Sequence, residues 1–250
     1  MRTLIALFLL AAPLSAPAQP VDADDARVLI VVTSHDQMGD TGNPTGAYFS
    51  EITHPYAVFT EHGYTVDIVS PEGGRTPLIA AGTRDSVTAR LLYDANFMNK
   101  LDDAKTPDEV NPTDYAAIYY AGGHGAMWDL PDATQINQMT ATIFEHEGVV
   151  GGVCHGPAGL VNVKLSDGSY LVAGRTVSAF TNEEEEAAGA TDIMPFLLET
   201  RLRERGATFA EGPKWEAHVA ESGRLITGQN PASAEGVAEA MVEALGARGL

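Results

Sequence analysis

The chain has 250 residues, of which 15 are Lys or Arg and 34 are Asp or Glu, so its formal net charge is −19 at pH 7. A field of that sign repels phosphate backbones and anionic lipids, which argues against nucleic acid and membrane surfaces as partners. The single cysteine excludes an intrachain disulfide, and a lone cysteine in an exported chain is typical of a reactive thiol.

The first residues have the pattern of an export signal. Arg2 precedes a short apolar run, Leu4 to Ala12, and Ser15-Ala16-Pro17-Ala18 ends in the small residues that signal peptidase requires. The run is shorter than the roughly 20 apolar residues of a spanning helix. We therefore expect residues 1–18 to be a signal peptide, residues 19–250 to form one domain, and the mature protein to be periplasmic or secreted, without membrane attachment.

Short β-branched runs alternate with helical segments along the rest of the chain. We expect strands at 28–32, 64–69, 116–121, 149–153, 176–180 and 225–227, and helices ending near 62 and at 132–146, 156–163, 195–205 and 232–245. This order predicts an α/β sandwich with a mostly parallel sheet and helices on both faces. Residues 71–112 fit the order badly, and we interpret them as a cap-like insertion of short helices and loops.

The most informative segment is Val149 to Pro157, in which a buried strand leads directly to Cys154 and a helix is expected from Gly156. This arrangement is typical of a nucleophile elbow. A helix N-terminus lowers the pKa of a thiol, so we expect a reactive thiolate. The backbone N–H of His155 is placed to stabilise an oxyanion. The alternative is an inert buried cysteine.

Two further strand ends should meet this elbow, because ligands bind at the carboxyl ends of parallel strands. Gly122, Gly123 and His124 follow one strand, and their backbone could supply the other half of an oxyanion hole, although an ordinary glycine-rich turn has the same pattern. Glu51 lies early in a helix after the first strand, where a surface carboxylate is the common alternative. The seven histidines have no HExxH or His-x-His spacing, so we expect no metal site.

Several motifs in order give the chain a resemblance to the ThiJ/PfpI superfamily (class I glutamine amidotransferase-like proteins), and within it to the heat-shock chaperone/glyoxalase III branch. The match covers roughly residues 27–245. The residues that carry it are Thr45-Gly46 with Glu51, His54-Pro55, Thr106 to Asn111 before Asp114-Tyr115, Gly122 to Gly125 with Asp129, Cys154 to Pro157, Phe180 with the acidic run after it, and Gly228 to Ser233.

The resemblance implies a flavodoxin-like fold and a Cys-His-acid triad. In it Cys154 is the nucleophile, His155 its neighbour, and the acid falls in the run 183–186, by spacing at Glu185 with Glu186 as rival. The other glutamates of that run are interpreted as a solvated helix start. Glu51 would contact the thiol, and because adjacent like charges disfavour each other, a thiolate there favours a protonated Glu51.

The function that the resemblance implies is a cofactor-free glyoxalase III-like enzyme, a homodimer acting on small α-oxoaldehydes such as methylglyoxal. Two alternatives stay open, because one constellation supports several chemistries. The first is a cysteine-dependent amidase, peptidase or deglycase. The second is a non-catalytic stress chaperone or a redox sensor in which Cys154 is oxidised.

Overall fold

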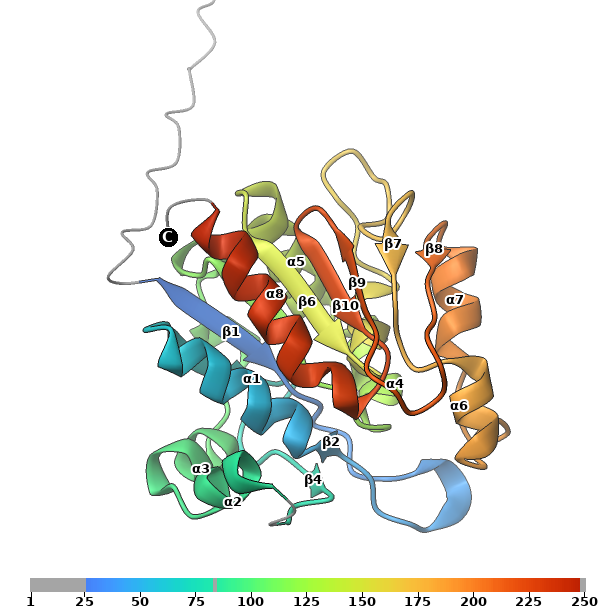
Figure 1. Cartoon of the computed structure of the whole chain (residues 1–250), viewed down its shortest axis with the longest axis horizontal. Coiled ribbons are helices and arrows are strands. Elements are labelled where there is room, and N and C mark those ends of the chain that lie inside the picture. Colours follow the sequence, from blue (N-terminus) through green and yellow to red (C-terminus); the bar gives the residue numbers. More distant parts are fainter. Residues whose placement is uncertain (1–25, 83–84, 248–250) are drawn as a thin grey trace, which may run out of the picture.

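A six-stranded sheet forms the centre of the molecule (Figure 1). The structure is a computed structural model, which describes residues 26–82 and 85–247. The expected signal peptide therefore lies outside the described residues. The strand order is β3-β1-β5-β6-β10-β9, and every pairing is parallel except that of β9 with β10. The bounds are β1 Arg27–Val31, β3 Thr65–Val69, β5 Ala117–Tyr120, β6 Val149–Val153, β9 Val219–Ser222 and β10 Leu225–Gly228.

Two small parallel pairs lie outside this sheet. One joins β2 (Ala47–Tyr48) to β4 (Leu78–Ile79), and the other joins β7 (Thr176–Val177) to β8 (Thr208–Phe209). The main sheet is buried on both faces, as the β-branched runs predict. In β1, for example, Val28 and Ile30 belong to the core on one face, while Leu29 and Val31 belong to the core on the other.

Helices cover both faces of the sheet, which confirms the expected sandwich (Figure 1). On one face lie α1 (Ser50–Glu61), α2 (Ser86–Leu92), α3 (Ala95–Asp102) and α8 (Ala234–Gly246). On the other lie α4 (Ala126–Asp129), α5 (Thr134–Glu145) and α7 (Leu198–Glu204), with the short α6 (Asn182–Ala187) next to α7. Among the described residues, no helix has both the length and the apolarity to cross a membrane.

Short 3-10 turns complete the fold. They are Gly39–Thr41, Pro107–Glu109, Pro112–Asp114, Leu130–Asp132, Gly156–Leu160 and Pro231–Ser233. The segment 71–112 holds β4, α2, α3 and the turn at 107–109, so the expected short helices and loops are present. Its helices and β4 pack against α1, β2 and β3, and through β2 it supports the loop that leads to Glu51. Its role as a cap over the site stays a prediction.

Two expected elements differ from the structure, and one strand was missed. The α-helix expected at 156–163 is a five-residue 3-10 turn, because Pro157 and two glycines in it disfavour an α-helix. The strand expected at 176–180 ends at Val177, and the N–H of Ser178 bonds to the hydroxyl of Thr227 at 2.8 Å. Strand β9 was not expected at all, since its four residues carry only a weak alternating pattern.

Candidate active site

Cys154 follows directly after β6 at the carboxyl edge of the sheet, with its backbone at φ 58°. This left-handed conformation is unfavourable for any residue with a Cβ, and such strain clusters at functional sites. The turn closes because Gly156 follows, where a Cβ would press against the carbonyl oxygen of Tyr120. The thiol is only 4% exposed. The strand-to-turn geometry of a nucleophile elbow is therefore present.

The expected lowering of the Cys154 pKa is wrong for this arrangement. The 3-10 turn is too short to supply a strong helix dipole. Burial, followed by the charge and hydrogen bond of Glu51, raises the pKa of the thiol well above its ordinary value, although backbone N–H groups of Gly123 and His155 oppose the shift. Ionisation of Cys154 therefore depends on the protonation of Glu51.

Glu51 lies in the first turn of α1, and its side chain is fully buried. Its carboxyl oxygen Oε2 accepts a hydrogen bond from the N–H of Gly122 at 2.8 Å. Burial raises the pKa of Glu51 to about 8, against the lowering effect of the hydrogen bonds with Cys154 and Gly122. A surface carboxylate is excluded, and at pH 7 the carboxyl group beside the thiol is mostly protonated.

The backbone carbonyl of Glu51 is bonded to the central sheet because a proline four residues later cannot donate to it. Pro55 lies inside α1 and has no N–H to donate to the carbonyl of Glu51. The hydroxyl of Tyr119 on β5 donates to that carbonyl instead, at 3.0 Å. The helix is thereby tied to the central sheet at the residue that carries the buried carboxyl group.

We expect Tyr119→Phe to lower the free energy of unfolding by about 1–3 kcal/mol, because the buried carbonyl of Glu51 would lose its partner. Tyr120→Phe is a matched control on the same strand. Its hydroxyl contacts the hydroxyl of Thr140, which also bonds to the carbonyl of Ile136, so the Thr140 hydroxyl keeps a partner and no backbone carbonyl loses its donor. Urea unfolding of the two variants measures the difference, and equal losses would contradict this role of Tyr119.

A chain of contacts runs from the thiol to an acidic side chain. Sγ of Cys154 lies 3.3 Å from Nδ1 of His155, and Nε2 of His155 lies 2.7 Å from Oε2 of Glu185. Glu185 is 2% exposed, whereas its rival Glu186 is exposed to solvent. The structure therefore brings Cys154, His155 and Glu185 together in the order of a Cys-His-acid triad.

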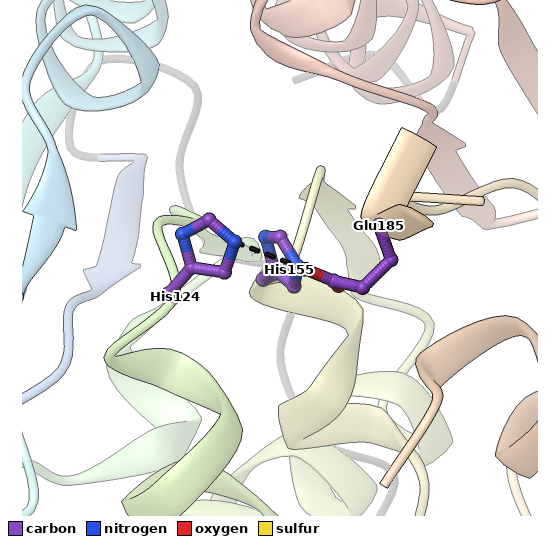
Figure 2. Close-up of side chains that lie close together, drawn as sticks. All are labelled: His124, His155 and Glu185. Carbon is purple, nitrogen blue, oxygen red and sulfur yellow. Dashed lines mark hydrogen bonds and ion pairs between the residues drawn. The ribbon is translucent and has the colours of Figure 1, made fainter. Parts of the chain in front are cut away.

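A second histidine shares the same carboxylate. Nε2 of His124 lies 3.1 Å from Oε1 of Glu185, and its ring lies 4.3 Å from the ring of His155, centroid to centroid (Figure 2). Burial raises the pKa of Glu185, but the hydrogen bonds from the two histidines outweigh this effect and lower it to about 2. Burial and the neighbouring His124 lower the pKa of His155, so its imidazole is neutral at pH 7.

The backbone donors expected for an oxyanion divide into two groups. The N–H of Gly122 is occupied by Glu51, so this part of the expectation is wrong. The N–H groups of Gly123 and His155 hydrogen-bond to the sulfur of Cys154, and their part in an oxyanion hole stays a prediction. Gly122 is required for another reason, since a Cβ on it would lie 2.8 Å from the N of His155 and would press on Glu51.

Comparison with known proteins places this site in a family. Residues 44–244 match the DJ-1/PfpI family. The chain belongs to this family. It is 33% identical over 236 residues to a glutathione-independent glyoxalase of Schizosaccharomyces pombe, covering 88% of this chain and 96% of that protein. It is 30% identical over 233 residues to glyoxalase 3 of Candida albicans, covering 87% and 98%.

Solved structures of DJ-1/PfpI-type proteins have the same fold. The crystal structure of glyoxalase III from Candida albicans matches with a TM-score of 0.82 and 29% identity, covering 88% of this chain and 98% of that one. The Rapid Encystment Protein of Francisella tularensis matches with a TM-score of 0.84 and 38% identity, covering 88% and 99%. The ThiJ/PfpI resemblance and its glyoxalase III branch are thus confirmed.

In this DJ-1/PfpI chain the acidic run contains a second buried glutamate that the sequence interpretation missed. Glu184 is fully buried, not solvated. Its Oε1 accepts hydrogen bonds from the N–H of Trp215 and the side-chain amides of Gln229 and Asn230, and its Oε2 accepts from Thr181. The capping-box spacing of Thr181 and Glu184 was the available signal. The hub holds the first turn of α6, and with it Glu185, against the end of β10.

Two aromatic rings extend from the triad to the surface. The N–H of Phe180 donates to the carbonyl of Cys154 at 2.9 Å, and its ring lies 4.4 Å from the ring of His155. Trp215 lies 5.7 Å from Phe180 and is 49% exposed. Asp129, another residue of the resemblance, accepts from Thr33 at 2.7 Å and so ties α4 to the loop after β1.

Proposed function

We propose that this chain is a glutathione-independent glyoxalase that converts methylglyoxal and similar α-oxoaldehydes to 2-hydroxy acids, with D-lactate as the product from methylglyoxal. The observation that carries the proposal is the fully buried Glu51 carboxyl group against the thiol of Cys154, backed by the His155–Glu185 pair. The relatives named as glutathione-independent glyoxalases support this function over an amidase, a deglycase or a chaperone.

The first step is addition of the thiol to the aldehyde carbon. A bond forms between Sγ of Cys154 and that carbon while the C=O π electrons move to oxygen, and the thiol proton passes to the product as a hemithioacetal forms. The N–H groups of Gly123 and His155 stabilise the oxygen while it is negative. The thiol plays the part that glutathione plays in other glyoxalases, so no cofactor is required.

The second step moves a proton between the two substrate carbons. Neutral His155 removes the C1 proton of the hemithioacetal, and protonated Glu51 gives its proton to the C2 oxygen, which produces an enediol. The protonated His155 then returns its proton to C2 while the C1 hydroxyl proton passes back to the Glu51 carboxylate, and the C1 oxygen becomes the carbonyl of a 2-hydroxy thioester. Water then cleaves the S–C bond, releasing the 2-hydroxy acid and the free thiol of Cys154.

The test is turnover of methylglyoxal by the purified mature protein in buffer without glutathione. We expect methylglyoxal to disappear and D-lactate to accumulate in equal amount, measured with D-lactate dehydrogenase. An assay with L-lactate dehydrogenase should detect no product, because protonation of C2 within the site fixes the configuration. Absence of D-lactate under these conditions would contradict the proposed function.

Further proposals concern the location of the protein, its oligomeric state and its partners. The small-residue pattern at Ser15-Ala16-Pro17-Ala18 supports export and cleavage after Ala18, giving a periplasmic or secreted enzyme. The resemblance supports a homodimer. The net charge of −19 supports solubility and a small-molecule substrate over nucleic acid or membrane partners.

A further inference from the structure

Three side chains from separate segments present metal-ligating atoms to one point beside the thiol. Nε2 of His124 comes from the loop after β5, Nε2 of His155 from the elbow, and a carboxylate oxygen of Glu185 from the first turn of α6. These atoms all lie within 4.8 Å of one another, and Figure 2 shows the two imidazoles directed toward the same carboxyl group.

The ligand set matches the preferences of a divalent transition metal ion. Two imidazole nitrogens and one carboxylate oxygen form a common three-ligand set of catalytic zinc, with water in the fourth position. With metal–ligand bonds of about 2.0–2.1 Å, neighbouring ligand atoms in a tetrahedral site lie about 3.3 Å apart. The contacts of Glu185 with His155 and His124, at 2.7 and 3.1 Å, run to its two different oxygens, and all three ligand atoms lie within 4.8 Å of one another, so a small movement brings them to that spacing.

His124 is the residue that a triad alone does not explain. A Cys-His-acid triad needs one imidazole on the acid, and His155 supplies it. His124 occupies the second oxygen of Glu185, and 22% of its side chain is open to solvent, whereas His155 is 1% exposed. The cluster therefore has one partly exposed ligand, His124, next to two buried ligands, His155 and Glu185.

The thiol lies on the other side of the His155 ring. Sγ of Cys154 contacts Nδ1, while the proposed metal-binding atom is Nε2. A ligating histidine usually engages its second ring nitrogen with an outer partner, and here that partner is Cys154. A metal ion bound at Nε2 therefore does not need the thiol as a ligand, which separates this site from ordinary capture of zinc by a cysteine.

We propose that His124, His155 and Glu185 bind a divalent transition metal ion such as Zn²⁺, and that the occupied protein is inactive. The ion binds Nε2 of His155 and the carboxylate of Glu185 in place of the hydrogen bond between them. The acid can then no longer orient and stabilise the imidazole during proton transfer. Binding itself is independent of the proposed function. Inhibition rests on it.

The binding test is calorimetric titration of the chelator-treated full chain with Zn²⁺. We expect one tight site per chain that is retained in Cys154→Ser and in Glu186→Gln, the exposed neighbour of Glu185. We expect His124→Ala and Glu185→Gln to weaken it by at least about tenfold, since even outer partners of a metal site contribute that much. His124→Ala is the safer variant because its side chain is partly exposed, and thermal melting checks the fold of each.

Either of two results would overturn the site. Unchanged affinity in His124→Ala would assign the zinc to surface carboxylates, and loss of affinity in Cys154→Ser would assign it to the thiol. The inhibition arm uses methylglyoxal turnover, in which the midpoint of zinc inhibition should equal the dissociation constant from calorimetry. Full activity at saturating zinc would overturn the inhibition. A chain that binds zinc but converts no methylglyoxal would instead contradict the proposed function alone.

Discussion

Replacing Cys154 with serine is expected to reduce methylglyoxal turnover by at least about 10⁴-fold, as loss of a covalent nucleophile does in other enzymes. The hydroxyl is similar in size to the thiol, but its oxygen is a far weaker nucleophile toward an aldehyde than sulfur is. Because the residue is buried in a turn of fixed geometry, the fold should survive the change. D-Lactate formation by the variant measures the effect.

The control for this variant is its thermal stability, which should stay close to that of the wild type. Labelling with iodoacetamide gives a second check, because the chain has one cysteine and the variant should take up no label. Turnover within a few-fold of the wild type, in a folded and unlabelled variant, would exclude Cys154 as the nucleophile.

Replacing Glu51 with glutamine is expected to lower turnover by about 10²–10⁴-fold, the usual effect of losing a general acid or base. The amide can keep a hydrogen bond with the N–H of Gly122 but cannot exchange a proton with the substrate. Glu243→Gln is the control for the chemical exchange itself, since Glu243 is exposed on α8 and receives the same substitution away from the site. Equal turnover in the two variants would refute the proton-transfer role of Glu51.

The same substitution has a consequence for stability that depends on pH. The pKa of Glu51 is about 8 in the folded protein and 4.5 as the ordinary value, so the folded chain binds this proton more tightly than the unfolded chain. The free energy of unfolding of the wild type should therefore fall as pH rises from 4.5 to about 8, by at most about 5 kcal/mol at 1.36 kcal/mol per pKa unit. Glu51→Gln should remove this fall.

Urea unfolding at pH 5 and at pH 8.5, compared between the wild type and Glu51→Gln, measures this contribution. The stability of the variant relative to the wild type should rise between the two pH values. An identical pH dependence in both proteins would mean that Glu51 is ionised at neutral pH. The shared proton between Glu51 and Cys154 would then be excluded.

The elements that carry the site could be predicted from the sequence because each has a local signal. Buried strands appear as continuous β-branched runs, and the elbow appears as a strand followed at once by Cys154 and Gly156. Since parallel strands end at one edge of the sheet, the meeting of Glu51, Gly122 and Cys154 also followed from the order of elements. The resemblance then selected Glu185, whose contact with His155 the structure shows.

The features that could not be predicted depend on burial and on contacts between distant segments. The direction of the Cys154 pKa shift is set by the burial of the thiol and by the neighbouring Glu51. Neither can be recognised from the sequence of a short turn. Glu184 looks like any residue of an acidic run until α6 meets the amides of Gln229 and Asn230. The cluster of His124, His155 and Glu185 has no fixed spacing, because its ligands lie on three segments.

The burial of the single thiol has a consequence for the proposed export of the chain. Thiol–disulfide exchange requires one sulfur to approach another in line, through a mixed disulfide. Because Cys154 is only 4% exposed and the rings of His155 and Phe180 pack together beside it, the sulfur of another protein cannot make this approach. Under the proposed export, this burial would keep a reduced cysteine from cross-linking to other proteins.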